Sequence, residues 1–271
     1  MRATSTASLA QARERWEPVL RDAGDTAATY GEQLFGVVDL LEANVALRRA
    51  LTEPSREGED RARLAEAVLG GKVDAAVADL VAGLVRERWS QPGDFTDAIE
   101  SLGTTSVLAA AEHAGRLEEV EDEAYRLDRI LDGQRELRLA LAARERSGEE
   151  RGRLMADVLA GKVGPETEVL AVRAASTPRG RSVHVALREI AEMAAARRQR
   201  LVASVTSAVP LSDKQITRLA DILTRQHGRE VEVHVGLDPE VVGGLRIQVG
   251  EQVVDATLAS RLADARRRLA G

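Results

Sequence analysis

The chain contains an internal repeat, and this repeat constrains the fold more than any other feature of the sequence. Residues 40–73 match residues 130–163 at 16 of 34 positions without a gap, so each residue corresponds to the one 90 positions further along. Helices rich in alanine, leucine and arginine resemble one another by chance, but not in one register over this length. A fixed period of this kind indicates a duplicated structural unit.

Each copy of the repeat has the pattern of a series of helices. In the first copy Leu34, Val38 and Leu41 recur at the spacing of one helical face. The second copy follows the same plan, and Ser147 and Glu150 have the three-residue spacing of a capping box at the start of a short helix. Because the hydrophobic residues are mainly alanine, leucine and valine, we expect helices that pack through aliphatic cores.

The pattern changes to a period of two after residue 200, which predicts half-buried strands. The alternating apolar positions are Val231, Val233, Val235, Leu245, Ile247 and Val249. An earlier extended stretch runs from 201 to 208, and Ser212 with Gln215 is expected to cap a helix that ends near His227. A last helix is predicted over 258–269.

The expected fold class is therefore mainly α, with two tandem antiparallel helical bundles followed by a small α+β domain. The predicted boundaries are 1–105 for the first bundle, 106–200 for the second and 201–271 for the C-terminal domain.

Composition and charge exclude several classes of function. A net charge of −6 and a pI near 5.5 make the average field repel phosphate backbones, so we expect no nucleic-acid partner. The chain has no cysteine, which excludes disulfides and thiolate chemistry and is typical of a cytoplasmic protein. No apolar run approaches the ~20 residues that span a bilayer, so membrane association is expected only through a partner.

The repeated Gly-Lys pairs, Gly71-Lys72 and Gly161-Lys162, suggest a phosphate-binding loop at first sight. Such a loop needs a further glycine, a serine or threonine after the lysine and a preceding strand, whereas valine follows each lysine here. The alternative is that each glycine ends a helix in the left-handed conformation while the lysine lies near the negative helix end. We predict two helix ends.

The other candidate groups give no frame for catalysis or metal binding. The histidines lie far apart without metal-binding spacing, and we expect them to be exposed or incidental; they are His113, His184, His227 and His234. The acidic run 118–123 lacks the spacing of a calcium loop and is expected to form a solvated helix face. The run 266–268 of three arginines fits either an anionic partner or the end of a helix. We expect no cofactor, no metal and no small-molecule substrate.

The C-terminal stretch resembles the end of the delta subunit of F-type ATP synthases, the relatives of the mitochondrial oligomycin-sensitivity-conferring protein. In that family a strand leads through an aspartate and a Gly-Gly turn into a second strand that ends in glycine. The segment 205–212 is similar to the stretch that opens this domain in the family. The residues that match the motif, and that the resemblance makes structural or interface candidates, are Asp238, Val241, Gly243, Gly244, Leu245, Ile247, Gly250, Asp255, Arg261 and Leu262.

The resemblance implies a stator component without an active site. In the family the helical bundle binds N-terminal segments of the alpha subunits, and the C-terminal domain binds the peripheral-stalk b subunit. The implied location is the cytoplasmic face of the cell membrane, as a peripheral part of the complex that couples proton transport to ATP synthesis. The family usually has one bundle and this chain has two, which suggests extra reach or stiffness.

Two other interpretations compete with the stator. The duplicated bundle alone fits a free-standing helical-repeat adaptor or scaffold protein. Scattered carboxylates fit, more weakly, an acid/base enzyme, which would require a concave pocket with acids of perturbed pKa.

Overall fold

The computed structural model describes residues 2–143, 145–198, 201–227, 231–237, 245–249 and 252–255. The chain forms two compact units, Met1–Arg198 and Gln199–Gly271, and each contains its own buried core residues. Among the described residues, no helix combines the length and the apolar composition that crossing a membrane requires.

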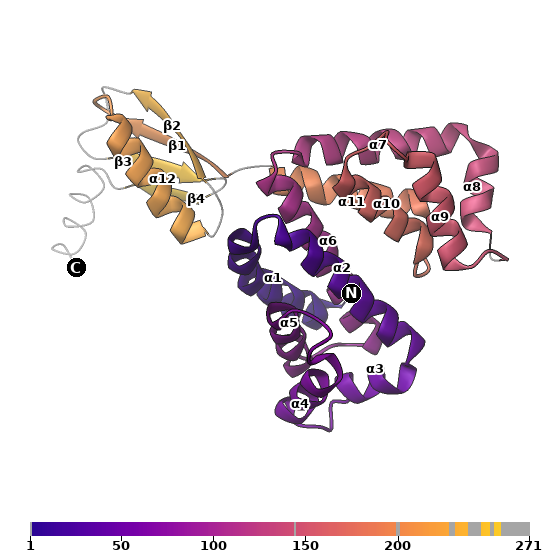
Figure 1. Cartoon of the computed structure of the whole chain (residues 1–271). Helices are drawn as coiled ribbons and strands as arrows, with labels where there is room; N and C mark the ends of the chain where they lie inside the picture. The colour runs from indigo at the N-terminus through magenta and orange to yellow at the C-terminus, as the bar shows by residue number, and fades with distance from the viewer. Residues whose placement is uncertain are drawn as a thin grey trace. The chain divides into compact units, whose positions relative to one another are not determined.

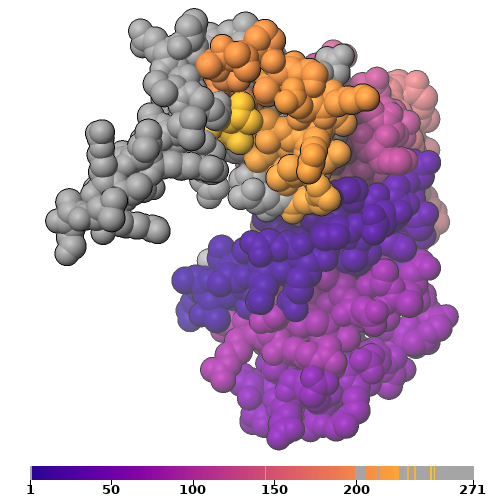
Figure 2. Space-filling view, turned by 90° about the vertical axis from the view of Figure 1, so that its left-hand side faces the viewer, coloured from indigo at the N-terminus to yellow at the C-terminus, as the bar shows by residue number. Residues whose placement is uncertain are grey.

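The first unit consists entirely of helices and short connections (Figure 1). Its helices are α1 (Ala3–Ala23), α2 (Thr26–Ala43), α3 (Val45–Thr52), α4 (Gly58–Leu69), α5 (Ala75–Arg86), α6 (Pro92–His113), α7 (Leu117–Gly133), α8 (Arg135–Ala142), α9 (Gly148–Leu159), α10 (Pro165–Ser176) and α11 (Val183–Arg198). In Figure 2 the N-terminal helices, in indigo, pack against the purple and magenta helices that follow them.

The sequence repeat is also a repeat of helices. The bounds of α8, α9 and α10 are those of α3, α4 and α5 displaced by the same 90 residues, and α7 ends 90 residues after α2. The side chain at one repeated position even keeps its role: Gln33 accepts a hydrogen bond from the backbone N–H of Asp74, and Glu123 accepts one from Gly164. The capping box of Ser147 and Glu150 is present as predicted.

Helix α6 belongs to both copies. By position it corresponds to α11 in the first copy and to α1 in the second, and it runs without a break across residue 105 (Figure 1). Phe95 and Ile99 of α6 are buried in the core of the first copy, whereas Val107 and Leu108 are buried in the core of the second. The predicted division into bundles 1–105 and 106–200 stays a prediction, and these two cores meet on one helix.

Two glycines allow α2 and α6 to pack closely in the first copy. A β-carbon on Gly31 would lie 2.8 Å from the backbone oxygen of Gly103 and 2.6 Å from a methyl group of Val107. A β-carbon on Gly103 would lie 2.6 Å from the ring of Phe35. Real carbon atoms do not approach so closely, so larger residues at these positions would push the two helices apart.

The second unit is a small α+β fold. Its elements are β1 (Leu201–Ser207), α12 (Asp213–His227), β2 (Val231–Leu237), β3 (Leu245–Val249) and β4 (Gln252–Asp255). The strand order is β2-β1-β3-β4, with β1 parallel to β2 and antiparallel to β3. Helix α12 covers the sheet through Leu223, which is buried with Val231 against Leu219 and Ile247.

The expected fold class, mainly α with a small α+β part, is confirmed. The extended stretch predicted at 201–208 is strand β1, and the hydroxyl of Ser212 donates to Gln215 at the start of α12. The helix predicted over 258–269 lies outside the described residues.

Candidate inter-repeat interface

Arg173 on α10 links the two copies of the repeat. Its Nε and Nη2 atoms donate to the carboxylate of Glu100 on α6 at 3.0 and 2.8 Å, and its Nη1 atom donates to Asp39 on α2 at 2.8 Å. The guanidinium also lies over the ring of Phe35, 4.9 Å from the ring centroid. The side chains of Arg173 and Glu100 are only 10% and 9% exposed, so the pair is effectively desolvated.

Arg179, in the connection after α10, makes a second link. Its Nη2 atom lies 2.9 Å from Asp97 of α6 and 3.1 Å from Glu42 of α2, and its Nη1 atom donates to the backbone oxygen of Thr96. Among the described residues that are not glycine, Arg179 alone has a positive φ, 49°. Its backbone therefore adopts a conformation that costs about 1–3 kcal/mol and that its contacts must hold in place.

Arg197, in the last turn of α11, makes a third link. Its guanidinium lies 2.6 Å from Glu17 of α1 and 2.6 Å from Glu112 of α6. Its side chain is 14% exposed. Each of the three arginines thus comes from the second copy and binds two carboxylates that come from the first copy or from the shared helix α6.

The carboxylates offset the effect of burial on Arg173 and Arg197. Burial alone would lower the pKa of Arg173, but the hydrogen bonds and charges of Glu100 and Asp39 outweigh it and raise that pKa. The same balance raises the pKa of Arg197, where Glu17 and Glu112 are the partners. Paired guanidinium and carboxylate groups of this geometry fix direction as well as distance, so the interface resists sliding between the two copies.

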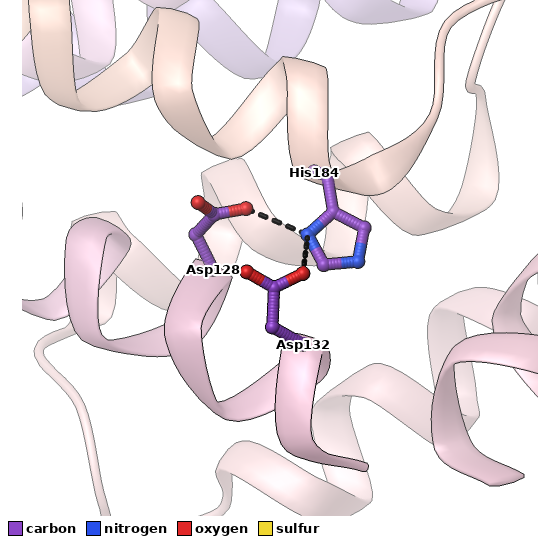
Figure 3. Close-up of side chains that lie close together, drawn as sticks. All are labelled: Asp128, Asp132 and His184. Carbon is purple, nitrogen blue, oxygen red and sulfur yellow. Dashed lines mark hydrogen bonds and ion pairs between the residues drawn. The ribbon is translucent and has the colours of Figure 1, made fainter. Parts of the chain in front are cut away.

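A second charged cluster joins α7 to α11 inside the second copy (Figure 3). His184, at the start of α11, lies with its Nδ1 atom 2.7 Å from Asp128 and 3.7 Å from Asp132, both on α7. The other oxygen of Asp128 accepts a hydrogen bond from Arg188 at 3.1 Å. The expectation that His184 is exposed or incidental is wrong, because the fold brings together groups that lie 56 residues apart in the sequence.

The cluster around Asp128 fits an ion pair better than a metal site. The three side chains could offer ligand atoms within 4.8 Å of one another, but Arg188 already places a positive charge on Asp128. Burial raises the pKa of the Asp128 carboxyl, and the hydrogen bonds from His184 and Arg188 outweigh this effect and lower that pKa below its ordinary value. The arrangement clamps α7 to α11.

The two Gly-Lys pairs are helix ends, as predicted. Gly71 and Gly161 have φ of 70° and 68°, in the left-handed region. The Nζ atom of Lys72 donates to the backbone oxygen of Val68, and the Nζ atom of Lys162 donates to the backbone oxygen of Val158. Each lysine therefore satisfies a carbonyl that the end of the helix leaves free.

The structure describes the backbone of only part of the family motif. Leu245 and Ile247 lie on β3, where both are half-buried, and Asp255 ends β4 opposite Arg246. The other motif residues, Asp238, Val241, Gly243, Gly244, Gly250, Arg261 and Leu262, lie outside the described residues, as does the arginine run 266–268. Their roles stay predictions. Of the histidines, His113 is exposed as expected, and the side chains of His227 and His234 are not among those described.

Known proteins of one family resemble this chain over its whole length. The family model described as ATP synthase delta (OSCP) subunit matches residues 104–269. Proteins named ATP synthase subunit delta from Beutenbergia cavernae and Streptomyces griseus are 56% and 44% identical over 271 residues, and each match covers all of both chains.

Less similar proteins also match. The protein of that name from Thermobifida fusca is 40% identical over 271 residues, again with all of both chains covered. A chain of the mitochondrial ATP synthase hexamer of Toxoplasma gondii is 21% identical, with 62% of this chain and 95% of that chain covered and a TM-score of 0.27, too low to support a structural argument. The sequence matches show that the chain belongs to the ATP synthase delta (OSCP) subunit family.

Proposed function

We propose that the chain is a non-catalytic subunit of the peripheral stalk of a proton-translocating F-type ATP synthase. It links N-terminal segments of the alpha subunits to the b subunit and holds the catalytic head still while the rotor turns. Its place is the cytoplasmic face of the cell membrane, which it reaches only through the complex. Membership of the delta family, with full-length relatives 56% and 44% identical, supports the assignment to the synthase.

The observation that carries the mechanical part of this proposal is the interface of Arg173, Arg179 and Arg197. A stator must transmit torque without bending, and an apolar interface alone lets packed helices slide by small steps. Each arginine here fixes one element of the second copy to two carboxylates of α1, α2 or α6. The helical unit is thereby braced at three separate points along its length.

The two units divide the binding work in this proposal. An amphipathic segment of an alpha subunit docks on the helical unit in the helix-in-groove mode. A hollow of about 390 Å³ between α6, α10 and α11, with the half-buried Met193 beside polar residues such as Thr104 and Arg181 in its lining, is a place for such a contact. The α+β unit holds the b subunit, through the strand residues Leu245 and Ile247 and the family-motif residues Asp238, Val241, Gly243 and Gly244.

The test is co-assembly of purified components. We expect the full chain to co-purify with the alpha-containing head and with the b subunit, because it bridges them. The fragment 1–198, which is a compact unit with its own two cores, is expected to keep the head and lose b. If this fragment binds b as tightly as the full chain does, the proposed division of binding between the two units is wrong. If the full chain binds neither partner, the interpretation as a free-standing adaptor is favoured.

A mechanical readout separates bracing from binding. A variant with Arg197→Met keeps the exposed surface of the bundle and removes the third link, since Arg197 is buried. We expect the variant complex to assemble and to show less ATP-driven proton pumping per ATP hydrolysed. The matched control is Arg63→Met, which removes an exposed arginine whose ion-pair partner, Asp60, lies in its own helix. Equal coupling in both variants would contradict a bracing role.

A further inference from the structure

Helices α7 and α11 border a groove of about 470 Å³ on the second copy of the repeat. Small and aromatic side chains, Ala191, Ala195 and Tyr125, form its apolar part. Five carboxylates also line it, of which Arg198 pairs with Glu118 and Glu121, and Arg126 pairs with Asp122. The groove therefore combines apolar side chains with the carboxylates of Glu119 and Glu192, which lie outside these three pairs.

The repeat shows how the helix pair at this groove differs from its equivalent in the first copy. The corresponding helices of the first copy, α2 and α6, touch closely at Gly31 and Gly103. At the matching positions 90 residues later the second copy has Glu121 and Met193, which cannot permit the same approach. In the second copy α7 and α11 still pack together, joined by Asp128 with His184 and Arg188, and the groove lies beside Tyr125, Ala191 and Ala195.

The repeat also shows what an aromatic ring at this position can bind. Phe35 of the first copy is 5% exposed and lies under the guanidinium of Arg173, which comes from the other copy. Its counterpart 90 residues later is Tyr125, which is 55% exposed at the groove. The ring of Tyr125 thus offers a cation the face that Phe35 offers to Arg173, with carboxylates nearby to strengthen the attraction.

We propose that the groove between α7 and α11 is a docking surface for a basic amphipathic helix of a partner polypeptide. The small side chains of Ala191 and Ala195 receive the apolar face of that helix, and one of its arginines or lysines lies over Tyr125. Carboxylates such as Glu119 and Glu192 contact its flanking cations. The choice of a basic partner follows from the carboxylates of Glu119 and Glu192, which lie in the lining outside the pairs of Arg198 and Arg126. This surface is additional to the alpha and b contacts proposed above.

The experiment measures the binding of a defined probe to the full chain. The probe is a synthetic helix of about five turns, built from alanine and leucine on one face and arginine on the other. A second peptide, with glutamate in place of every arginine, controls for apolar attraction. Titration calorimetry gives the Kd of each, and we expect the arginine peptide alone to bind.

Variants of the groove decide between docking and general attraction. We expect Tyr125→Ala, and separately Glu119→Gln with Glu192→Gln, to raise the Kd about tenfold, whereas Tyr125→Phe stays near the original value because it keeps the ring. The matched control, Glu14→Gln with Asp22→Asn on α1, removes the same charge from exposed positions and should change the Kd less than twofold.

Two results would overturn the docking surface. One is an equal weakening by the groove and control variants, which would mean that only net charge attracts the probe. The other is binding by the fragment 1–198 but not by the full chain, which would mean that the groove is covered by the chain's own residues 199–271. Neither result bears on co-assembly with the synthase, so failure here and failure of the stalk role are distinguishable.

Discussion

Replacing Arg173 by methionine tests whether the inter-repeat interface is held by desolvated charge. Methionine keeps most of the aliphatic stem and removes the guanidinium, and with it the contact over the ring of Phe35. The change leaves the carboxylate of Glu100, 9% exposed, without the guanidinium that satisfies both of its oxygens. The loss therefore combines the penalty of an unpaired buried carboxylate with the smaller loss of the contact with Phe35.

The magnitude follows from the burial of each partner. Breaking a buried ion pair by removing one member costs about 3–5 kcal/mol. The contact with Asp39 adds little, because that side chain is 54% exposed and exposed pairs contribute ~1 kcal/mol or less. We expect Arg173→Met to lower the free energy of unfolding by about 3–5 kcal/mol. The double variant with Glu100→Met should recover most of this loss, because two apolar side chains replace the whole pair.

The assay is urea unfolding of the full chain and of the fragment 1–198, followed by helical circular dichroism. A lower midpoint with an unchanged slope means that stability changed and the unfolded state did not. The reasoning fails if Arg173→Met costs less than about 1 kcal/mol, the level of an exposed pair. It also fails if the double variant is less stable than either single variant, since the two losses would then be independent.

Three further predictions use the same assay. Gly31→Ala should cost about 1–3 kcal/mol, because its β-carbon would lie 2.8 Å from the backbone oxygen of Gly103, whereas Gly36→Ala on the same helix meets nothing within 4 Å and should be neutral or stabilising; equal effects would contradict close packing. Gly161→Ala should cost about 1 kcal/mol or more because its φ is 68°, and no change would mean that the helix end rearranges freely. Asp128 has a lowered pKa in the folded chain, so it holds fewer protons there than when unfolded; its contribution is complete above the ordinary Asp pKa of about 3.9 and is lost as pH falls through the lower folded value. The free energy of unfolding of the Asp128→Asn variant should therefore decrease less than that of the original chain as the pH falls below about 4. An equal decrease in both chains would contradict this.

Local features of the fold were predictable from the sequence because they depend on neighbours along the chain. The left-handed glycines at 71 and 161 and the capping box at Ser147 need only a few adjacent residues to form. The strands of the C-terminal unit were predictable because apolar and polar residues alternate there with a period of two. A helix with one buried face has a period of 3.6 instead. The repeat adds a check, since the helices of one copy recur in the other with nearly the same bounds.

The interface between the copies could not be predicted, for two physical reasons. Its contacts join residues 73 to 180 positions apart, such as Arg173 with Glu100 and Arg197 with Glu17, and no local pattern marks such pairs. The matching positions of the first copy carry Gly83 and Val107. The two copies therefore differ at the positions of Arg173 and Arg197. A comparison that looks for identical residues in the two copies gives no weight to these positions.

That difference between the copies is itself a signal in the sequence. A residue that packs inside each copy is under the same constraint in both, whereas a residue that joins one copy to the other is not. Charges present in one copy and absent from the other therefore mark positions such as Arg173 and Arg197.

The sharing of α6 has a consequence for how such a chain can grow. Adding a copy of the repeat adds five helices, not six, because α6 both ends the first copy and begins the second. Growth therefore requires neither a new linker nor a new surface, only that the closing helix carry apolar residues on two sides. Repeating the same duplication at α11 would give a longer chain of this family, and its length would increase in increments of 90 residues.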